Sequence, residues 1–171
     1  MPQAHVQTGD RELPVGPVHP IAVVLDHLRS AHNVGNIFRL ADLCRIAHVH
    51  TCGYTPAPPH PKLVKTARGC DTLVPSTHHA TCRDALLALR QQGYTCVAVE
   101  TVPAAPELWD AAWPSPVAFV FGNEALGISA DALPLCELTI RLPVYGHKNS
   151  LNVGNCAAVV LYEAVHRLRQ A

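Results

Sequence analysis

The stretch FVFGNEALGIS, residues 119–129, joins an apolar run to a Gly-x-x-x-x-Gly spacing that extends from Gly122 to Gly127. An apolar strand followed by a glycine-rich turn is typical of α/β proteins that bind nucleotides. A phosphate-binding P-loop also requires a Lys directly after its second glycine, where this chain has Ile128. An apolar side chain cannot neutralise phosphate charge, and the chain contains no Gly-x-Gly. The stretch therefore predicts a strand and a tight turn that serve a different kind of site.

Short apolar runs rich in β-branched residues alternate along the chain with segments of helical spacing. This alternation predicts an α/β fold in which helices flank a mostly parallel sheet. The expected strands cover 21–25, 47–52, 72–75, 95–100, 118–121 and 138–143, and the expected helices cover 33–45, 81–93 and 150–169.

The length and composition fit a single domain with a full apolar core. The chain has 171 residues, of which 49% are hydrophobic. We expect a loose arm at 1–17 and one domain over 18–171. No apolar run is long enough to span a bilayer, and the first residues do not resemble a secretion signal, so the expected compartment is the cytosol.

Cysteine and charge content argue against two other classes of protein. None of the 7 cysteines forms a C-x-x-C pair, so buried free thiols are expected rather than a zinc site or a disulfide framework. The 13 basic and 13 acidic residues give a formal net charge of zero. This balance disfavours a strongly basic nucleic-acid binder but allows a local basic patch.

A second polar segment, HNVGNIFRLAD at 32–42, places Asn33 and Asn36 on either side of Gly35. If a helix begins near Asn33, Asn36 and Arg39 lie on one face and can reach one polar group. Two amides and a glycine at a helix start favour an anion site. The alternative is a polar helix start with a solvated arginine.

A third polar segment, SLNVGNCAAVVLYEA at 150–164, opens a strongly apolar helix. Simple capping by Asn149 or Ser150 would explain the polar residues before that helix. It would not explain Asn152 and Asn155 inside the first turns, because Asn has a poor helix propensity. The segment is therefore a candidate for a functional site.

Together, the three segments resemble the signature motifs of the SpoU-type RNA ribose 2′-O-methyltransferases, which belong to the SPOUT superfamily. The matching elements are Asn…Gly-Asn-x-x-Arg at 33–39, Phe-Gly-Asn-Glu-x-x-Gly at 121–127 and Ser-Leu-Asn-Val at 150–153. They occur in the family order, and the resemblance extends from about Ile21 to Arg167. One such match would be weak evidence, whereas three at ordered spacing are specific.

The resemblance implies a SPOUT fold with a C-terminal deep trefoil knot, a homodimer, and S-adenosylmethionine bound in the knot. The glycines of the turn would let the backbone approach the adenosine, and Leu142 and Leu151 would enclose the adenine. No metal is expected, because the sulfonium is itself a good leaving group. The implied cofactor-binding residues are Val99, Glu100, Thr101, Gly122, Leu142, Ser150 and Leu151. The implied catalytic residues are Asn33, Arg39, Glu124, Ser150 and Asn152.

Arg39 matches an arginine that the family requires, to which activation of the ribose 2′-hydroxyl is often assigned. Because a guanidinium loses its proton only above about pH 12, an electrostatic role is more plausible chemically. We expect Arg39 to bind the phosphate beside the target ribose and so align its hydroxyl. Asn33 would orient Arg39 or the ribose. Glu124 would be either a structural anchor or an acceptor near the site, and the sequence leaves both roles open.

RNA contacts are expected on a basic segment in the first half of the chain. Lys62, Lys65 and Arg68 follow one another at three-residue steps, which on a helix gives a basic stripe suited to an RNA backbone. Arg29, just before the first motif, is expected to extend this surface. The alternative is an ordinary solvated helix face.

The histidines at 48, 50, 78 and 79 form a separate group. His48 and His50 alternate on an expected strand and can face the same way. We expect a half-exposed strand face there, with a metal-binding pair as the alternative. His78 and His79 are expected in a loop.

The leading hypothesis is an S-adenosylmethionine-dependent RNA ribose 2′-O-methyltransferase that acts on tRNA or, failing that, on rRNA. A non-catalytic SPOUT-like dimer that binds RNA or a nucleotide is the rival from another class. A generic nucleotide-binding α/β domain is a third hypothesis, which the missing phosphate-binding motifs disfavour.

Overall fold

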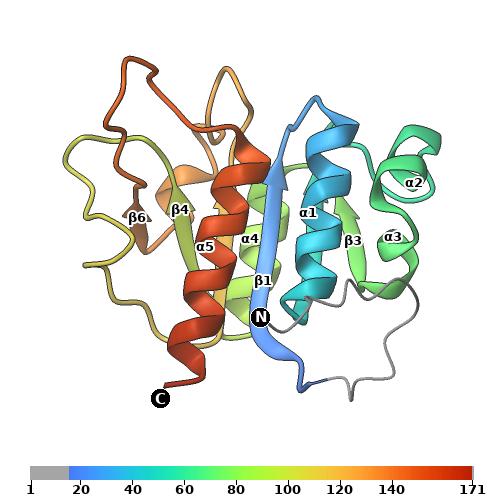
Figure 1. Ribbon diagram of the computed structural model, residues 1–171, viewed down its shortest axis with the longest axis horizontal. Coiled ribbons are helices and arrows are strands. Elements are labelled where there is room, and N and C mark those ends of the chain that lie inside the picture. Colours follow the sequence, from blue (N-terminus) through green and yellow to red (C-terminus); the bar gives the residue numbers. More distant parts are fainter. Residues whose placement is uncertain (1–15, 171) are drawn as a thin grey trace, which may run out of the picture.

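A six-stranded, all-parallel sheet forms the centre of the protein in the computed structural model, which describes residues 16–170 (Figure 1). The strand order is β3-β2-β1-β5-β4-β6, and every neighbouring pair runs parallel. Most of the expected arm at 1–17 lies outside the described residues. The strands are β1 (His19–Asp26), β2 (Ile46–Cys52), β3 (Ser76–His79), β4 (Thr95–Val99), β5 (Val117–Phe121) and β6 (Leu138–Ile140).

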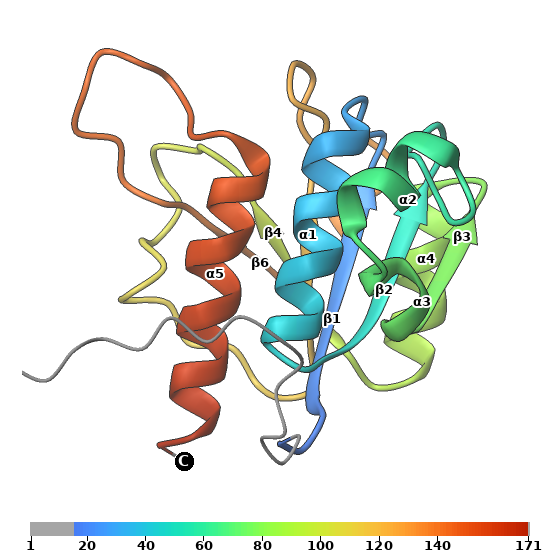
Figure 2. The ribbon, with the colours of Figure 1, turned by 45° about the vertical axis from the view of Figure 1, so that its right-hand side comes forward.

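Helices cover both faces of the sheet (Figures 1 and 2). Helices α1 (Ala31–Leu43) and α5 (Val153–Leu168) lie side by side on one face, and α4 (Cys82–Gln91) lies on the other. Because both faces are covered, the central strands are largely apolar, and all five residues of β5 are buried. Two short helices, α2 (Pro61–Ala67) and α3 (Cys70–Leu73), pack beside α1, and a 3-10 turn, η1 (Leu133–Leu135), precedes β6.

The predicted parallel α/β architecture is confirmed, but the expected strand at 72–75 is wrong. That segment contains the end of α3, and the strand β3 follows it at Ser76–His79. The sequence STHH of β3 carries no apolar run, because the strand lies at the sheet edge and pairs with β2 alone. His78 and His79 therefore lie in a strand and not in a loop. The expected strand at 138–143 is shorter, since β6 ends at Ile140.

Two helix starts differ from the expectation because asparagine and serine act as caps. Ser30 caps α1 and accepts a hydrogen bond from the backbone N–H of Asn33 at 3.2 Å, so the helix begins before Asn33. Asn152 caps α5 and accepts from the backbone N–H groups of Gly154 and Asn155. Placing Asn152 inside the helix was wrong, as was capping by Asn149 or Ser150, and Asn is among the best capping residues.

A close packing of two helices fixes α2 against α1. A Cβ atom on Gly35 would lie 2.2 Å from the Thr66 hydroxyl oxygen, so only glycine permits this approach. The same hydroxyl lies 2.9 Å from the carbonyl oxygen of Ala31, to which it can donate. The close contact with Thr66 is a structural reason for glycine at position 35, in the second polar segment. Within residues 16–170, none of the helices combines the length and apolarity needed to cross a membrane.

Candidate active site

A cavity of about 730 Å³ opens at the carboxyl ends of three neighbouring strands, β4, β5 and β6. Its walls come from the residues that follow these strands and from the loop that leads into α5. This is the edge at which open parallel sheets bind their ligands, because the connections there are free to vary. The volume is in the range of a small-molecule site.

All seven predicted cofactor-binding residues lie along this cavity. They reach it from four separate segments, which meet only because parallel strands end at one edge. Their roles remain predictions, but the structure brings them together. The seven residues are Val99, Glu100, Thr101, Gly122, Leu142, Ser150 and Leu151.

The turn after β5 explains both glycines of the opening stretch. Asn123 and Gly127 exchange two backbone hydrogen bonds, at 3.0 and 2.9 Å, which close the turn on itself. A Cβ atom on Gly122 would lie 2.3 Å from the backbone of Gly127 and Ile128, and Gly127 has a φ of +73°. The turn itself therefore requires glycine at both positions, whatever ligand lies beside it.

Glu124 in this turn is held by donors from the start of α1. Its carboxylate accepts from the backbone N–H groups of Arg29 at 3.1 Å and Ser30 at 3.4 Å, and from the Asn33 side chain at 3.1 Å. Burial alone would raise the pKa of Glu124, but these hydrogen bonds and one within the residue itself outweigh burial and lower the pKa. At neutral pH, Glu124 is therefore an ionised acceptor that anchors the connection between β1 and α1.

Asn33 also reaches the third segment. Its side-chain oxygen accepts from the side chain of Asn152 at 3.2 Å, so the three segments join through Glu124, Asn33 and Asn152. The Asn36 side chain lies against Gly154, where an added Cβ atom would approach its nitrogen to 2.8 Å. Of the predicted catalytic residues, Glu124, Ser150 and Asn152 line the cavity and Asn33 supports two of them.

Arg39 does not line the cavity. Arg39 is exposed on α1. Burial raises the pKa of the Cys70 thiol on α3, and the nearby positive charge of Arg39 offsets part of that rise. Within residues 16–170, the Asn33 side chain bonds to Glu124 and Asn152 and makes no hydrogen bond with Arg39, which it was expected to orient. Arg39 can therefore meet a substrate only from the open side of α1.

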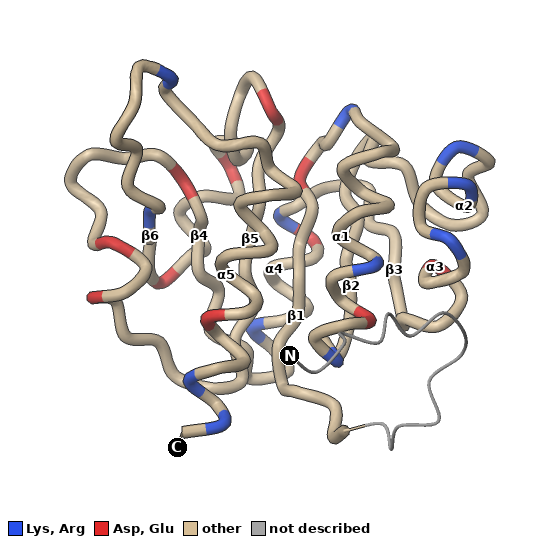
Figure 3. Tube along the Cα trace, viewed as in Figure 1, with Lys and Arg blue, Asp and Glu red and all other residues tan. Residues whose placement is uncertain are grey.

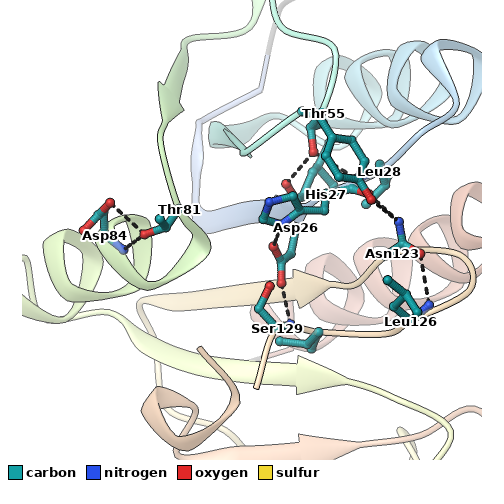
Figure 4. A network of polar contacts seen from close by, with 12 residues as sticks. Asp26, His27, Leu28, Thr55, Thr81, Asp84, Asn123, Leu126 and Ser129 are labelled. Carbon is teal, nitrogen blue, oxygen red and sulfur yellow. Dashed lines mark hydrogen bonds and ion pairs between the residues drawn. The ribbon is translucent and has the colours of Figure 1, made fainter. Parts of the chain in front are cut away.

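A partly buried polar network behind the turn was not predicted from the sequence (Figure 4). Asp26, which is fully buried at the end of β1, accepts from the Ser129 backbone N–H at 2.7 Å and contacts the His27 ring at 2.6 Å. The Asn123 side chain donates to the His27 carbonyl at 2.6 Å and to the Tyr54 hydroxyl at 2.8 Å. A lone Asp that ends an apolar strand is a signal that could have found part of this network.

The same asparagine also shapes the turn from within. Its side-chain oxygen accepts from the backbone N–H groups of Ala125 and Leu126, at 2.9 and 3.0 Å. Asn123 therefore fixes the turn and ties it to the connections after β1 and β2.

The cavity lining carries two carboxylates, Glu100 and Glu124, and one ammonium, Lys148. Glu100 accepts from the backbone N–H of Ile128 at 2.7 Å, which holds it at the cavity wall. Cys156 also lines the cavity, and burial followed by the nearby Glu100 charge raises its pKa to about 12. Its thiol stays neutral, so a thiolate nucleophile is not available at this position.

A second, open groove of about 610 Å³ collects most of the predicted RNA-binding residues. Arg29, Lys62 and Lys65 line it, and Figure 3 shows cationic segments on α2 and before α1 at the same end of the molecule. Arg68 is not on the predicted helical stripe, because α2 ends at Ala67 and Arg68 follows it with a left-handed backbone.

The histidines on β2 and β3 pack against one another at the edge of the sheet. His48 and His50 do face the same way, with ring centroids 4.5 Å apart, and His50 lies 2.9 Å from His79. His50 is only 6% exposed, so the expected half-exposed face holds for His48 alone. No group of three or more potential metal ligands is found among the described residues.

The fold and the cavity define a small α/β protein with a ligand site at the carboxyl edge of its sheet. Comparison with known proteins narrows this class to one family. The chain belongs to the SpoU rRNA Methylase family, whose profile matches residues 20–162.

Named relatives and solved structures agree with this assignment. The tRNA (guanosine(18)-2′-O)-methyltransferase of Thermus thermophilus is 30% identical over 84% of this chain and 73% of its own length. The enzyme of the same name from Escherichia coli K12 is 29% identical over 88% of this chain and 65% of its own length. The crystal structure of the SpoU methyltransferase AviRb from Streptomyces viridochromogenes, in complex with AdoMet, matches with a TM-score of 0.79. That match has 27% identity and covers 92% of this chain and 61% of AviRb.

Proposed function

We propose that the protein is an S-adenosylmethionine-dependent RNA ribose 2′-O-methyltransferase that acts on tRNA. The observation that carries the proposal is the meeting of three sequence segments at one cavity, through Glu124, Asn33 and Asn152. Membership of the SpoU family and the activities in the names of its relatives support the same reaction.

The cavity suits the chemistry of the methyl donor. Apolar side chains such as Leu142 and Leu151 offer surface to a purine, while Glu100 and Glu124 outnumber Lys148 and favour a cationic ligand. When bound, S-adenosylmethionine supplies an electrophilic methyl group to a ribose oxygen. A related SpoU methyltransferase has been solved with this cofactor.

The residues around the cavity then have distinct tasks. Glu124 holds the start of α1 at the cavity mouth and, as an ionised acceptor, does not donate a proton at neutral pH. Asn152 caps α5 and holds Asn33, so the two amides present fixed donors and acceptors to the substrate. Arg39 binds the phosphate next to the target ribose from the exposed side of α1 and aligns the 2′-hydroxyl.

The assembly and the path of the chain are part of the proposal. We expect a homodimer, since α1 and α5 lie side by side and expose large apolar side chains, with Leu43 64% and Tyr162 55% exposed. We also expect the segment after β6 to form the family's trefoil knot as it leads into α5. The cytosol remains the expected compartment.

The substrate class rests on the relatives. Two of them carry tRNA guanosine activities in their names, whereas a 29% identical relative from Streptomyces viridochromogenes is named as a 23S rRNA (uridine(2479)-2′-O)-methyltransferase. tRNA is therefore the first substrate to test and rRNA the second.

Two measurements test the function. Calorimetric titration with S-adenosylmethionine and S-adenosylhomocysteine should give micromolar binding at one site per chain. Incubation with labelled S-adenosylmethionine should then transfer methyl groups to unmodified tRNA, at positions that resist alkaline hydrolysis. Binding of RNA without transfer to either tRNA or rRNA would instead favour the non-catalytic binding protein.

A further inference from the structure

The groove beside α2 has a composition that the cofactor cavity does not share. Its lining contains three permanent cations, Arg29, Lys62 and Lys65, together with His32 and His60, and no carboxylate. Within residues 16–170, no charged side-chain nitrogen of these three residues lies within 4.0 Å of a carboxylate oxygen, so no ion pair with the described residues competes with a ligand. An acid-free groove of this kind is suited to a polyanion.

Tyr54 gives the groove an aromatic face. The residue is 56% exposed, although its hydroxyl is fixed by the Asn123 side chain at 2.8 Å. The His27 ring packs edge-on against the tyrosine ring, with centroids 4.8 Å apart. A large ring that is held at its polar end and at one edge, and is otherwise open, is a preformed stacking surface.

Hydrogen bonds join the lining of the groove to the turn that lines the cofactor cavity. Asn123 belongs to the turn that lines the cavity and bonds to Tyr54, which lines the groove. Glu124 in the same turn accepts from the backbone N–H of Arg29, which lies on the groove side. A strand bound in the groove would therefore be held against the turn that borders the cofactor cavity.

The cations are placed on a rigid support. Lys62 and Lys65 are three residues apart on α2, so their Cβ atoms are neighbours at about 5–6 Å. The Gly35–Thr66 contact holds α2 against α1, and Thr66 itself lines the groove. The backbone that carries these lysines would therefore need little further ordering when a ligand binds.

We propose that this groove binds a single-stranded segment of the RNA substrate, with one unpaired base stacked on Tyr54 and the adjoining phosphates on Arg29, Lys62 and Lys65. This inference rests on the proposed function, because it assigns the substrate of the same site to a surface. Proteins that recognise single-stranded RNA combine such charges with aromatic stacking, and stacking tolerates different bases.

The test measures binding of an unmodified tRNA transcript over a series of KCl concentrations. Tyr54→Leu should weaken binding about tenfold with the salt dependence unchanged, whereas Tyr54→Phe, which loses the same bond to Asn123 but keeps the ring, should stay within about threefold. Lys62→Gln with Lys65→Gln should lower the slope of log affinity against log salt by about 0.7 for each lost contact. Arg83→Gln, an exposed change on α4, is the matched control and should bind normally.

A fluorescent readout separates stacking from a structural effect. Transcripts that carry 2-aminopurine at single unpaired positions should include one whose emission is quenched by the wild-type protein and by Tyr54→Phe, but not by Tyr54→Leu. Affinity for S-adenosylmethionine, measured by calorimetry, should be equal in all variants.

Two results are distinguishable from each other. If the wild-type protein methylates RNA while the Tyr54→Leu and double lysine variants bind the transcript as tightly as wild type, the groove assignment is overturned and the proposed function stands. If the wild-type protein binds the cofactor but neither binds nor methylates RNA, the proposed function fails and the groove assignment falls with it.

Discussion

The side chain of Asn33 donates to the carboxylate of Glu124 at 3.1 Å, although 91 residues separate the two in sequence. The same Asn33 accepts from Asn152, which caps α5. One amide therefore holds together the start of α1, the turn after β5 and the start of α5. All three elements meet at the cavity. A substitution at Asn33, Glu124 or Asn152 should therefore change the geometry of the site more than it changes the rest of the fold.

Glu124→Gln should lower the rate of methyl transfer at least tenfold and change the affinity for S-adenosylmethionine much less. The variant amide presents one NH₂ group to a site where three donors point inward, so at least one of them loses its acceptor. The free energy of unfolding at pH 7 should fall by about 1 kcal/mol, as for a partly exposed acceptor. Single-turnover rates, calorimetry and urea denaturation would measure these effects.

The same variant has a defined pH signature. Because the folded-state pKa of Glu124 lies below its ordinary value of 4.5, its stabilising effect is present above that pH and is lost as the pH falls through the lowered value. The stability difference between wild type and Glu124→Gln should therefore shrink below pH 4.5. A constant difference down to pH 3 would contradict an ionised anchor.

Arg39→Ala should abolish methyl transfer and leave the affinity for S-adenosylmethionine nearly unchanged. The side chain is exposed on α1 and does not line the cofactor cavity, so its loss removes a substrate contact without touching the methyl donor. Arg39→Lys retains the charge but not the bidentate geometry and should restore part of the activity. Full activity in Arg39→Ala would show that the phosphate-binding role is wrong.

The sheet and its covering helices were predictable because buried parallel strands are apolar along their whole length. The edge strand β3 was not, since its STHH sequence pairs on one side only and its side chains are largely exposed. Helix boundaries failed where Asn152 acts as a cap, because capping depends on backbone angles that the residue type does not fix.

The candidate site was partly predictable for a different reason. The resemblance carried by three ordered motifs grouped the residues that the structure places along the cavity, and their cofactor-binding roles remain predictions. The contacts behind them were not predictable, because Asp26 and Ser129 are 103 residues apart and Tyr54 and Asn123 are 69 apart. Only the crossing connections of the sheet bring such pairs together.

Gly122→Ala should abolish binding of S-adenosylmethionine and lower the free energy of unfolding by about 1–3 kcal/mol. The new methyl group would lie 2.3 Å from the backbone of Gly127 and Ile128, and a backbone neighbour cannot move without opening the turn. Gly16→Ala, where nothing lies within 4 Å of an added Cβ, is the control and should behave as wild type. Normal cofactor affinity in Gly122→Ala would show that the shape of this turn does not determine cofactor binding.

The histidine cluster should make the protein less stable as the pH falls below 6.5. Burial lowers the pKa of His50 to about 3, and the nearby His48 and His79 rings contribute to the shift. A depressed folded-state pKa means that the neutral ring stabilises the protein above pH 6.5 and that this stability is lost as the pH falls toward 3. The loss that His50 alone contributes is at most about 1.4 kcal/mol for each pH unit.

Removing the ring at position 50 tests this directly. His50→Leu should reduce the pH dependence of the urea midpoint between pH 6.5 and 4. His48 and His79, whose pKa values are also lowered, should keep part of the slope, and Asp84 opposes the shift at His79. His147→Leu changes an exposed histidine and should leave the slope intact. An unchanged slope in His50→Leu would rule out His50 as the source.

Gly35→Ala should weaken RNA binding while leaving cofactor binding intact. An added Cβ atom would lie 2.2 Å from the Thr66 hydroxyl oxygen and 2.8 Å from the Thr66 backbone carbon, so α2 must move away from α1. Lys62 and Lys65 move with α2, whereas the residues that line the cofactor cavity belong to other segments. We expect affinity for a tRNA transcript to fall at least fivefold, with calorimetric binding of S-adenosylmethionine unchanged. Gly35→Ala combined with Thr66→Ala, which removes the hydroxyl oxygen nearest the added Cβ atom, should recover part of the loss, and wild-type RNA affinity in Gly35→Ala alone would contradict the role of this contact.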